Sequence, residues 1–165
     1  LVKKGTLAAL VGLAAVLVFM ALYYRVSGLV ADVALVLNGL LVLAIMSMIG
    51  TTLTLPGIAG FVLTLGMAVD ANVLINERIR EEMRGGRSVK LAVQLGYDRV
   101  FLTIVDSHVT TLVAALVLMK YGSGPVRGFA VALAIGLLAS MFTSIVVTRV
   151  IMEYLTRDDN ARISV

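Results

Sequence analysis

Two acidic residues, Asp70 and Asp106, interrupt long apolar runs of the sequence. Neither apolar run contains a lysine or arginine with which its aspartate could pair. Surrounding hydrocarbon makes an ionised carboxylate costly, so acidic residues are rare in membrane-spanning segments and mark functional sites when they occur there. Because the protonated form escapes this cost, such a group can take up and release a proton. The two aspartates are therefore predicted to carry protons.

Two further side chains could extend this chemistry. Glu77 lies seven residues after Asp70, on nearly the same face of a helix, so it could lead protons out of the membrane. It could equally pair with a neighbouring arginine at the membrane surface. His108 lies about 200° around the helix from Asp106, so it does not share that residue's surroundings. It could relay protons or form an interhelical hydrogen bond.

The depths of the two aspartates can be compared. Asp70 lies about 8 Å, and Asp106 about 9 Å, inside the same end of its predicted span, at about 1.5 Å per residue. Antiparallel neighbouring helices would then hold both carboxyl groups at similar height, which permits coupled titration if they face each other. The alternative is that either aspartate only packs helices together through hydrogen bonds to Ser or Thr.

The composition of the chain indicates that these residues lie in transmembrane helices. The chain is 60% hydrophobic and 15% charged, and its mean hydropathy is +1.03. These values are typical of an integral membrane protein and not of a soluble domain. We predict an all-α membrane protein, a single domain over residues 1–165, with a bundle of five transmembrane helices. The predicted spans are residues 7–24, 33–49, 57–75, 100–119 and 128–152.

The polar segments predict how the chain is oriented. Residues 76–99 form a charged loop, broken by Gly85 and Gly86, in which Ser88 is a good N-cap for a short helix over residues 89–95. Residues 156–165 form a polar tail. Ten of the fourteen lysines and arginines fall on the side of this loop and tail. The positive-inside rule therefore predicts that the loop and the C-terminus are cytoplasmic.

Small residues recur at every fourth position in the last predicted span. Such a ladder lets the backbone of another helix approach closely, so we predict a helix-packing role for it. It consists of Gly128, Ala132, Gly136, Ser140 and Ser144.

Other classes of function lack the residues that they require. The chain has no cysteine and a single histidine, which excludes disulfides and histidine clusters. No nucleotide-binding loop or nucleophile–base pair occurs, so we expect no enzyme activity, no cofactor and no metal. The net charge of +4 could suggest a protein that binds nucleic acid. Such a protein needs aromatic residues for base stacking, and these make up only 6% of the chain, so we expect no nucleic-acid partner. Leu1 is not a usual start, and we expect a segment of a longer polypeptide.

Three stretches resemble signature motifs of the SecD family of protein-export membrane proteins. The first runs from Thr54 to Glu82 and includes TLPGIAG, GMAVDANVLI and ERIREE. The second includes TIVD from Thr103 and VTT from Val109. The third is GSGPVRGFAV from Gly122. These motifs are long and the resemblance covers nearly the whole chain, so it is specific.

The resemblance implies a fold and a mechanism. The five spans would be the second to sixth helices of SecD, one half of a pseudosymmetric, transporter-like bundle. The family's key intramembrane aspartate aligns with Asp70, and its fifth-helix aspartate with Asp106. Proton flow through these groups would drive protein export. The family usually has Asn where this chain has His108, which leaves Asp106 intact but puts the role of its neighbour in question.

The resemblance also implies partners and a location. These are a SecF-like partner, separate or fused, the SecYEG channel, the translocating preprotein and the lipid bilayer of the bacterial inner membrane. Two alternatives stay open. One is a proton-driven efflux pump for small solutes from the same superfamily. The other is a passive membrane scaffold that holds a partner through the small-residue ladder.

Overall fold

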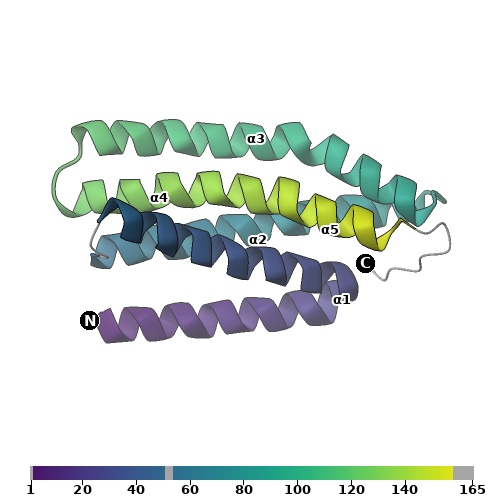
Figure 1. The fold of residues 1–165 in the computed structure, drawn as a ribbon, viewed down its shortest axis with the longest axis horizontal. Helices are drawn as coiled ribbons and strands as arrows, with labels where there is room; N and C mark the ends of the chain where they lie inside the picture. Colours follow the sequence, from purple (N-terminus) through teal and green to yellow (C-terminus); the bar gives the residue numbers. More distant parts are fainter. Residues whose placement is uncertain (1, 51–53, 158–165) are drawn as a thin grey trace.

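The computed structural model describes residues 2–50 and 54–157, which form an all-helical bundle (Figure 1). Along the chain lie α1 (Val2–Ile49), α2 (Leu55–Arg84), α3 (Val89–Tyr121), α4 (Pro125–Met141), the π-helix η1 (Phe142–Val147) and α5 (Thr148–Leu155). The last three elements follow one another without a break and form a single rod, Pro125–Leu155. The helices lie side by side along the long axis of the molecule (Figure 1).

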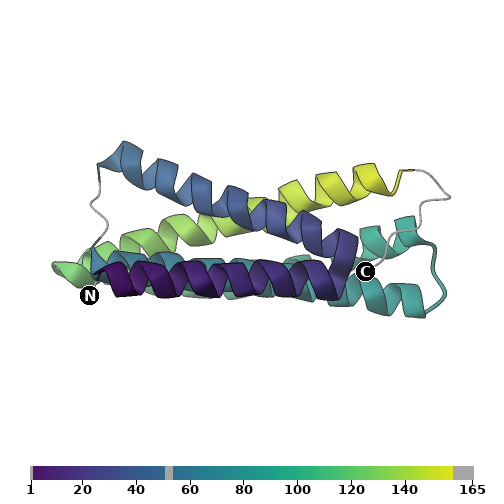
Figure 2. The ribbon, with the colours of Figure 1, turned by 90° about the horizontal axis from the view of Figure 1, so that it is seen from below.

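Residues 2–50 and 54–157 contain four helices that are long and apolar enough to cross a membrane, so the predicted count of five is not confirmed. The difference lies in α1, one helix of 48 residues that covers the predicted spans 7–24 and 33–49. Its chain doubles back at Arg25, which alone leaves the helical conformation, with φ of 50° (Figure 2). Because the break is one residue long, no loop separates the halves. We call residues 2–24 the first arm and residues 26–49 the second arm.

Gly28 explains how the chain can turn back so sharply. A Cβ atom at this position would lie 2.0 Å from the Met20 carbonyl oxygen, so a larger residue could not be accommodated. The Ser27 hydroxyl closes the turn by donating to the Tyr24 carbonyl oxygen over 3.1 Å. The turn is therefore fixed by a close backbone approach and by a local hydrogen bond.

The predicted loop over residues 76–99 is mostly helical. α2 continues to Arg84, and α3 begins at Val89, where the Ser88 hydroxyl accepts from the Leu91 amide at 3.4 Å. The predicted short helix over residues 89–95 is the beginning of α3 and not a separate element. Arg–Glu pairs three and four residues apart stabilise the polar extension of α2 as helix. Only Gly85–Ser88 remains as a turn, and most of the predicted tail, residues 158–165, lies outside the described residues.

The rod α4–η1–α5 occupies the middle of the bundle. α4 packs on α2, α3 and α1, and the buried residues Val42 and Ala132 show that the second arm of α1 makes this last contact. The first arm packs instead on α2 and on the second arm, through residues such as Met20 and Leu17. α2 and α3 carry the predicted functional residues. One face of each of these helices packs on the rod, and the other face forms part of the outer surface of the bundle.

Candidate functional site

Asp70 lies near the middle of α2 and faces away from the bundle. Gly66 and Leu74, one turn away on either side, are exposed as well, whereas Ala71 and Ile75 are buried. No lysine or arginine of the described residues forms an ion pair with Asp70. Acidic residues within membranes usually face a bundle interior. The Asp70 carboxylate instead lies on the outer surface of this bundle.

His108 is buried between α3 and α4. Its Nδ1 lies 2.9 Å from the Ile104 carbonyl oxygen, which can only accept, so Nδ1 carries a proton. Its Nε2 lies 3.1 Å from the Ser140 hydroxyl on α4. His108 therefore connects α3 with the central rod, which helical phase alone did not predict.

Asp106 lies on the outer face of α3, away from His108. It lines a shallow cavity of about 470 Å³ together with Thr103 and three apolar residues of the same helix. Leu74 and Thr103 line another cavity between α2 and α3, so Asp70, one helical turn further on, lies at the height of Asp106. The two carboxylates do not line a common cavity among those described here.

Glu77 accepts hydrogen bonds from two neighbouring side chains. Its Oε1 accepts from the Tyr24 hydroxyl at 2.9 Å and from Arg80 at 3.0 Å. The Arg80 guanidinium also lies over the rings of Tyr23 and Tyr24, 4.8 Å and 5.1 Å from their centres. These contacts hold the turn of α1 against the polar end of α2. The geometry agrees with the alternative of a surface residue paired with arginine.

A line of buried hydroxyl groups continues from His108 along the central rod. The Ser144 hydroxyl donates to the Ser140 carbonyl oxygen at 2.6 Å, and the Thr148 hydroxyl donates to the Ser144 carbonyl oxygen. The Tyr97 hydroxyl of α3 in turn donates to the Thr148 hydroxyl at 2.9 Å. We call His108, Ser140, Ser144, Thr148 and Tyr97 the polar seam. The π-helix η1 lies within it, and π-helical turns are frequent at functional sites.

The small-residue ladder packs inside this chain. A Cβ atom at Gly136 would lie 2.3 Å from the Thr64 hydroxyl of α2. A Cβ atom at Gly60 of α2 would lie 2.8 Å from the Phe129 carbonyl oxygen. Gly128 and Ala132 contact the same part of α2, whereas Ser140 and Ser144 belong to the polar seam. From Gly128 to Gly136 the ladder is thus occupied by α2.

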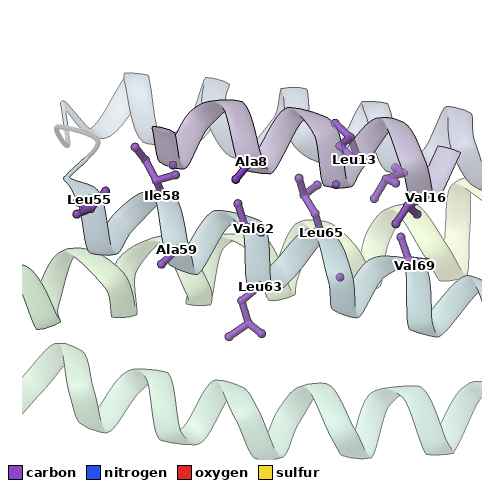
Figure 3. A pocket seen from close by; sticks show the side chains of 15 residues that line it. Ala8, Leu13, Val16, Leu55, Ile58, Ala59, Val62, Leu63, Leu65 and Val69 are labelled. Carbon is purple, nitrogen blue, oxygen red and sulfur yellow. The ribbon is translucent and has the colours of Figure 1, made fainter. Parts of the chain in front are cut away.

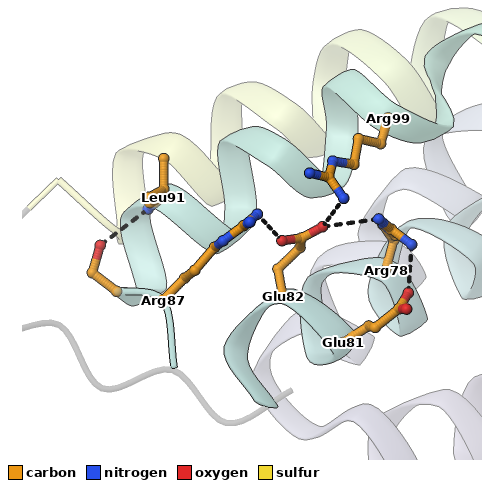
Figure 4. A network of polar contacts seen from close by, with 7 residues as sticks. Arg78, Glu81, Glu82, Arg87, Leu91 and Arg99 are labelled. Atoms are coloured by element: carbon orange, nitrogen blue, oxygen red, sulfur yellow. Dashed lines mark hydrogen bonds and ion pairs between the residues drawn. The ribbon is translucent and has the colours of Figure 1, made fainter. Parts of the chain in front are cut away.

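Glu82 is a buried charged residue that the sequence analysis did not identify. Its side chain is only 5% exposed and accepts from three arginines, Arg78 at 3.0 Å, Arg99 at 2.9 Å and Arg87 (Figure 4). The spacing of Arg78 and Glu82, four residues apart, could have indicated one of these pairs. The other two depend on how the turn brings α3 back beside α2. Glu82 therefore fixes the polar end of this hairpin.

Asp32 in the second arm of α1 was also missed. It directly precedes the predicted span 33–49, and one of its carboxylate oxygens is buried without a hydrogen-bond partner. Asn38, Asn72 and Asn76 likewise contain buried polar atoms without partners. The sequence indicates such buried polar side chains only by placing a polar residue at the start of, or within, an apolar run.

An apolar groove of about 670 Å³ lies between parts of the first arm of α1 and α2 (Figure 3). Glycine, alanine and branched aliphatic residues line it, so it contains no side chain able to carry a reaction. Among residues 2–50 and 54–157, no group of three or more His, Cys, Asp or Glu side chains could hold a metal ion.

Comparison with known proteins assigns the family. The family described as "Protein export membrane protein SecD/SecF, C-terminal" matches residues 1–158. The chain belongs to the SecD/SecF family. The SecD translocase subunit of Anaeromyxobacter dehalogenans is 84% identical over 165 residues, which are 100% of this chain and 27% of that protein. The SecD subunit of Syntrophobacter fumaroxidans is 62% identical over 154 residues, 93% of this chain and 29% of that protein.

Solved structures of the SecD/SecF family share this fold. The crystal structure of SecDF from Thermus thermophilus, described as a translocon-associated membrane protein, matches with a TM-score of 0.90 and 46% identity. The match covers 96% of this chain and 22% of that chain. SecDF in a super-membrane-facing form matches with a TM-score of 0.88 and 47% identity, over 93% of this chain and 21% of that one. The chain thus spans less than a third of the relatives named here.

Proposed function

We propose that this chain is the membrane-spanning part of a SecD subunit that uses the proton-motive force to promote protein export, with Asp70 as the proton-carrying group. One observation carries the proposal: a carboxylate without a cationic partner in the described residues faces outwards from the middle of an apolar helix. Exposed to lipid, it would be costly in its ionised form. Family membership supplies the process that such a group would drive.

The outward direction of Asp70 supports a covering partner. The structures that match this chain are named SecDF, and most of each of those chains lies outside the match. We infer that a SecF-like half, separate or fused, covers the side of α2 and α3 that carries Asp70 and Asp106. Asp106 would then face the partner in the same way. The SecYEG channel and the preprotein complete the proposed machinery.

The two arms of α1 support five membrane crossings. Each arm is about 35 Å long at about 1.5 Å per residue, enough for a hydrocarbon layer of about 30 Å. With the turn at Arg25 on the side of the Gly85–Ser88 turn, the basic residues concentrate on that side. The positive-inside rule favours a cytoplasmic location for both turns and for the C-terminus, in the bacterial inner membrane.

The polar seam supports a route by which a proton could act on the fold. We infer that a change of charge at Asp70 acts on His108, whose Nε2 contacts Ser140. Ser140 lies two residues before the π-helix η1, a type of segment that often marks a hinge. In this proposal η1 is the element with two arrangements, and the proton on Asp70 selects between them.

The test replaces Asp70 by Asn in the full-length protein. Proton-gradient-dependent release of a preprotein is then measured in membrane vesicles, with Asp106→Asn and unmodified protein beside it. Loss of the gradient-dependent part of the release, at unchanged assembly with the partner, is expected for Asp70→Asn. Undiminished release would reject the proton role. A direct efflux assay with small solutes separates export from the efflux alternative.

A further inference from the structure

Two asparagine side chains are buried on the inner face of α2. Asn72 is 3% exposed and Asn76, one helical turn later, is 5% exposed. Asn72 lies about 200° around the helix from Asp70, so the pair faces into the bundle and away from the outer surface. The Oδ1 atom of Asn72 and the Nδ2 atom of Asn76 are buried, and the described parts of the chain give neither atom a hydrogen-bond partner. An acceptor and a donor are thus left unpaired on neighbouring turns.

The spacing of the two amide groups fits one small molecule between them. A buried amide group without a partner is costly, above all within a membrane, where bulk water cannot reach it. Side chains four residues apart on a helix have Cβ atoms about 5–6 Å apart. Two hydrogen bonds in sequence, each of about 2.8 Å, span the same distance. A molecule that both donates and accepts can therefore bridge the pair.

The π-helix η1 lies level with the two asparagines. α2 and the rod run in the same direction along the bundle (Figure 1). They meet where a Cβ atom at Gly136 would touch Thr64. Eight residues beyond this contact, Asn72 on α2 is level with Ser144 on the rod. The contacts between α2 and η1 agree with this register, so the asparagines face the irregular part of the rod.

The hydroxyl groups of η1 at this level can only accept further hydrogen bonds. Thr143 is 1% exposed and Ser144 is 0% exposed. Their hydroxyl groups both donate to the Ser140 carbonyl oxygen, at 3.3 Å and 2.6 Å. A hydroxyl group has one proton to donate, so each of these oxygens has only acceptor capacity left. The rod thus offers a third partner to a molecule held by the two amide groups.

We propose that a water molecule binds between Asn72, Asn76 and η1. It donates one hydrogen bond to the Asn72 amide oxygen and one to the hydroxyl oxygen of Thr143 or Ser144, and it accepts one from the Asn76 amide nitrogen. About three hydrogen bonds to otherwise unsatisfied groups are typical of buried water in proteins. The water joins α2 to the π-helix. It does not contact Asp70 and is independent of the proposed proton role.

The experiment is cryo-electron microscopy of the full-length protein at a resolution that shows ordered water. The expected result is a density peak about 2.7–3.2 Å from the amide groups of both Asn72 and Asn76. Asn72→Leu, which keeps the size of the side chain and removes its polar atoms, is expected to lose the peak. Thr64→Val is the matched control, because Thr64 lies two turns earlier on the same buried face, and it retains the peak. Asp70→Asn retains it as well, so a failure of the proton role does not affect this test.

Unfolding of the full-length protein in detergent gives a second measurement. Asn72→Leu and Asn76→Leu each remove one end of the bridge. The double variant is therefore expected to raise the unfolding equilibrium constant by less than the product of the two single effects, by a factor of about two or more. Effects that simply multiply would contradict a shared water.

Three results from the map of the unmodified protein would overturn the proposal. The first is two ordered amide groups with no peak between them, and the second is a direct bond between Asn72 and Asn76. The third is a peak surrounded by oxygen ligands at about 2.3–2.6 Å, which would identify a metal cation instead of water. None of these results depends on whether a variant folds.

Discussion

At the scale of single residues, His108 has the most informative position. Its Nδ1 donates to the Ile104 carbonyl, so Nε2 is the atom that changes role when the ring takes up a proton. A neutral ring accepts from the Ser140 hydroxyl, whereas a charged ring donates to it. The hydroxyl must therefore turn when the ring changes charge. This makes His108 a positioning residue between α3 and the rod, in a place where the family resemblance implies Asn.

We expect His108→Leu and Ser140→Ala each to lower the free energy of unfolding by about 1–3 kcal/mol, because each leaves a buried polar group without its partner. The double variant is expected to lose less than the sum of the two, by about 0.5 kcal/mol or more. Unfolding of the full-length protein in detergent measures all three values. Strict additivity would contradict a direct bond, and Ser123→Ala at an exposed turn is the neutral control.

At the scale of elements, the central rod carries one irregularity. The π-helix Phe142–Val147 follows the ladder residues that pack on α2 and precedes Thr148, which binds Tyr97. A π-helical turn accommodates one more residue than an α-helix of the same length. The rod can therefore satisfy both its contact with α2 and its contact with the start of α3. The hydroxyl groups of Ser144 and Thr148, bonded to carbonyl oxygens one turn earlier, favour a bent or irregular helix here.

Deletion of Val146, an exposed residue of η1, is expected to leave a regular helix and to preserve the Tyr97–Thr148 bond. The loss of unfolding free energy should then be small, at most about 1 kcal/mol. Deletion of the exposed Leu138 in α4 is the matched control, and it turns all later residues by about 100° relative to α2 and α3. Thermal unfolding of both variants in detergent distinguishes them. Equal destabilisation would show that η1 does not hold an extra residue.

At the scale of the whole molecule, hydropathy predicted the bundle but not its connections. The apolar runs determine where membrane helices form, so the spans around Asp70 and Asp106 could be predicted. The turn at Arg25 could not, because it depends on the contact of Gly28 with the Met20 carbonyl. The helical phase of α3 gave the separation of Asp106 from His108. It could not give Ser140 as the partner of His108, since that bond depends on how α4 packs on α3.

The orientation of the chain can be mapped, since the sequence contains no cysteine. Single cysteines at Val26 and Lys90 are expected to react with a membrane-impermeant thiol reagent from the cytoplasmic side. A cysteine at Ser123 is expected to react from the opposite side, because α3 runs between these turns. Labelling in intact cells and in inverted vesicles gives the comparison. Reaction of Val26→Cys and Lys90→Cys from opposite sides would contradict five crossings.

The tight turn at Arg25 also bears on how the protein enters the membrane during synthesis. Two apolar arms of similar length are joined by one residue outside the helical conformation, so no hydrophilic stretch separates them. A charged residue in such a turn can stay on the side of synthesis while both arms cross as a pair. The first and second arms are therefore expected to be inserted together as a helical hairpin, in one event and not in two successive ones.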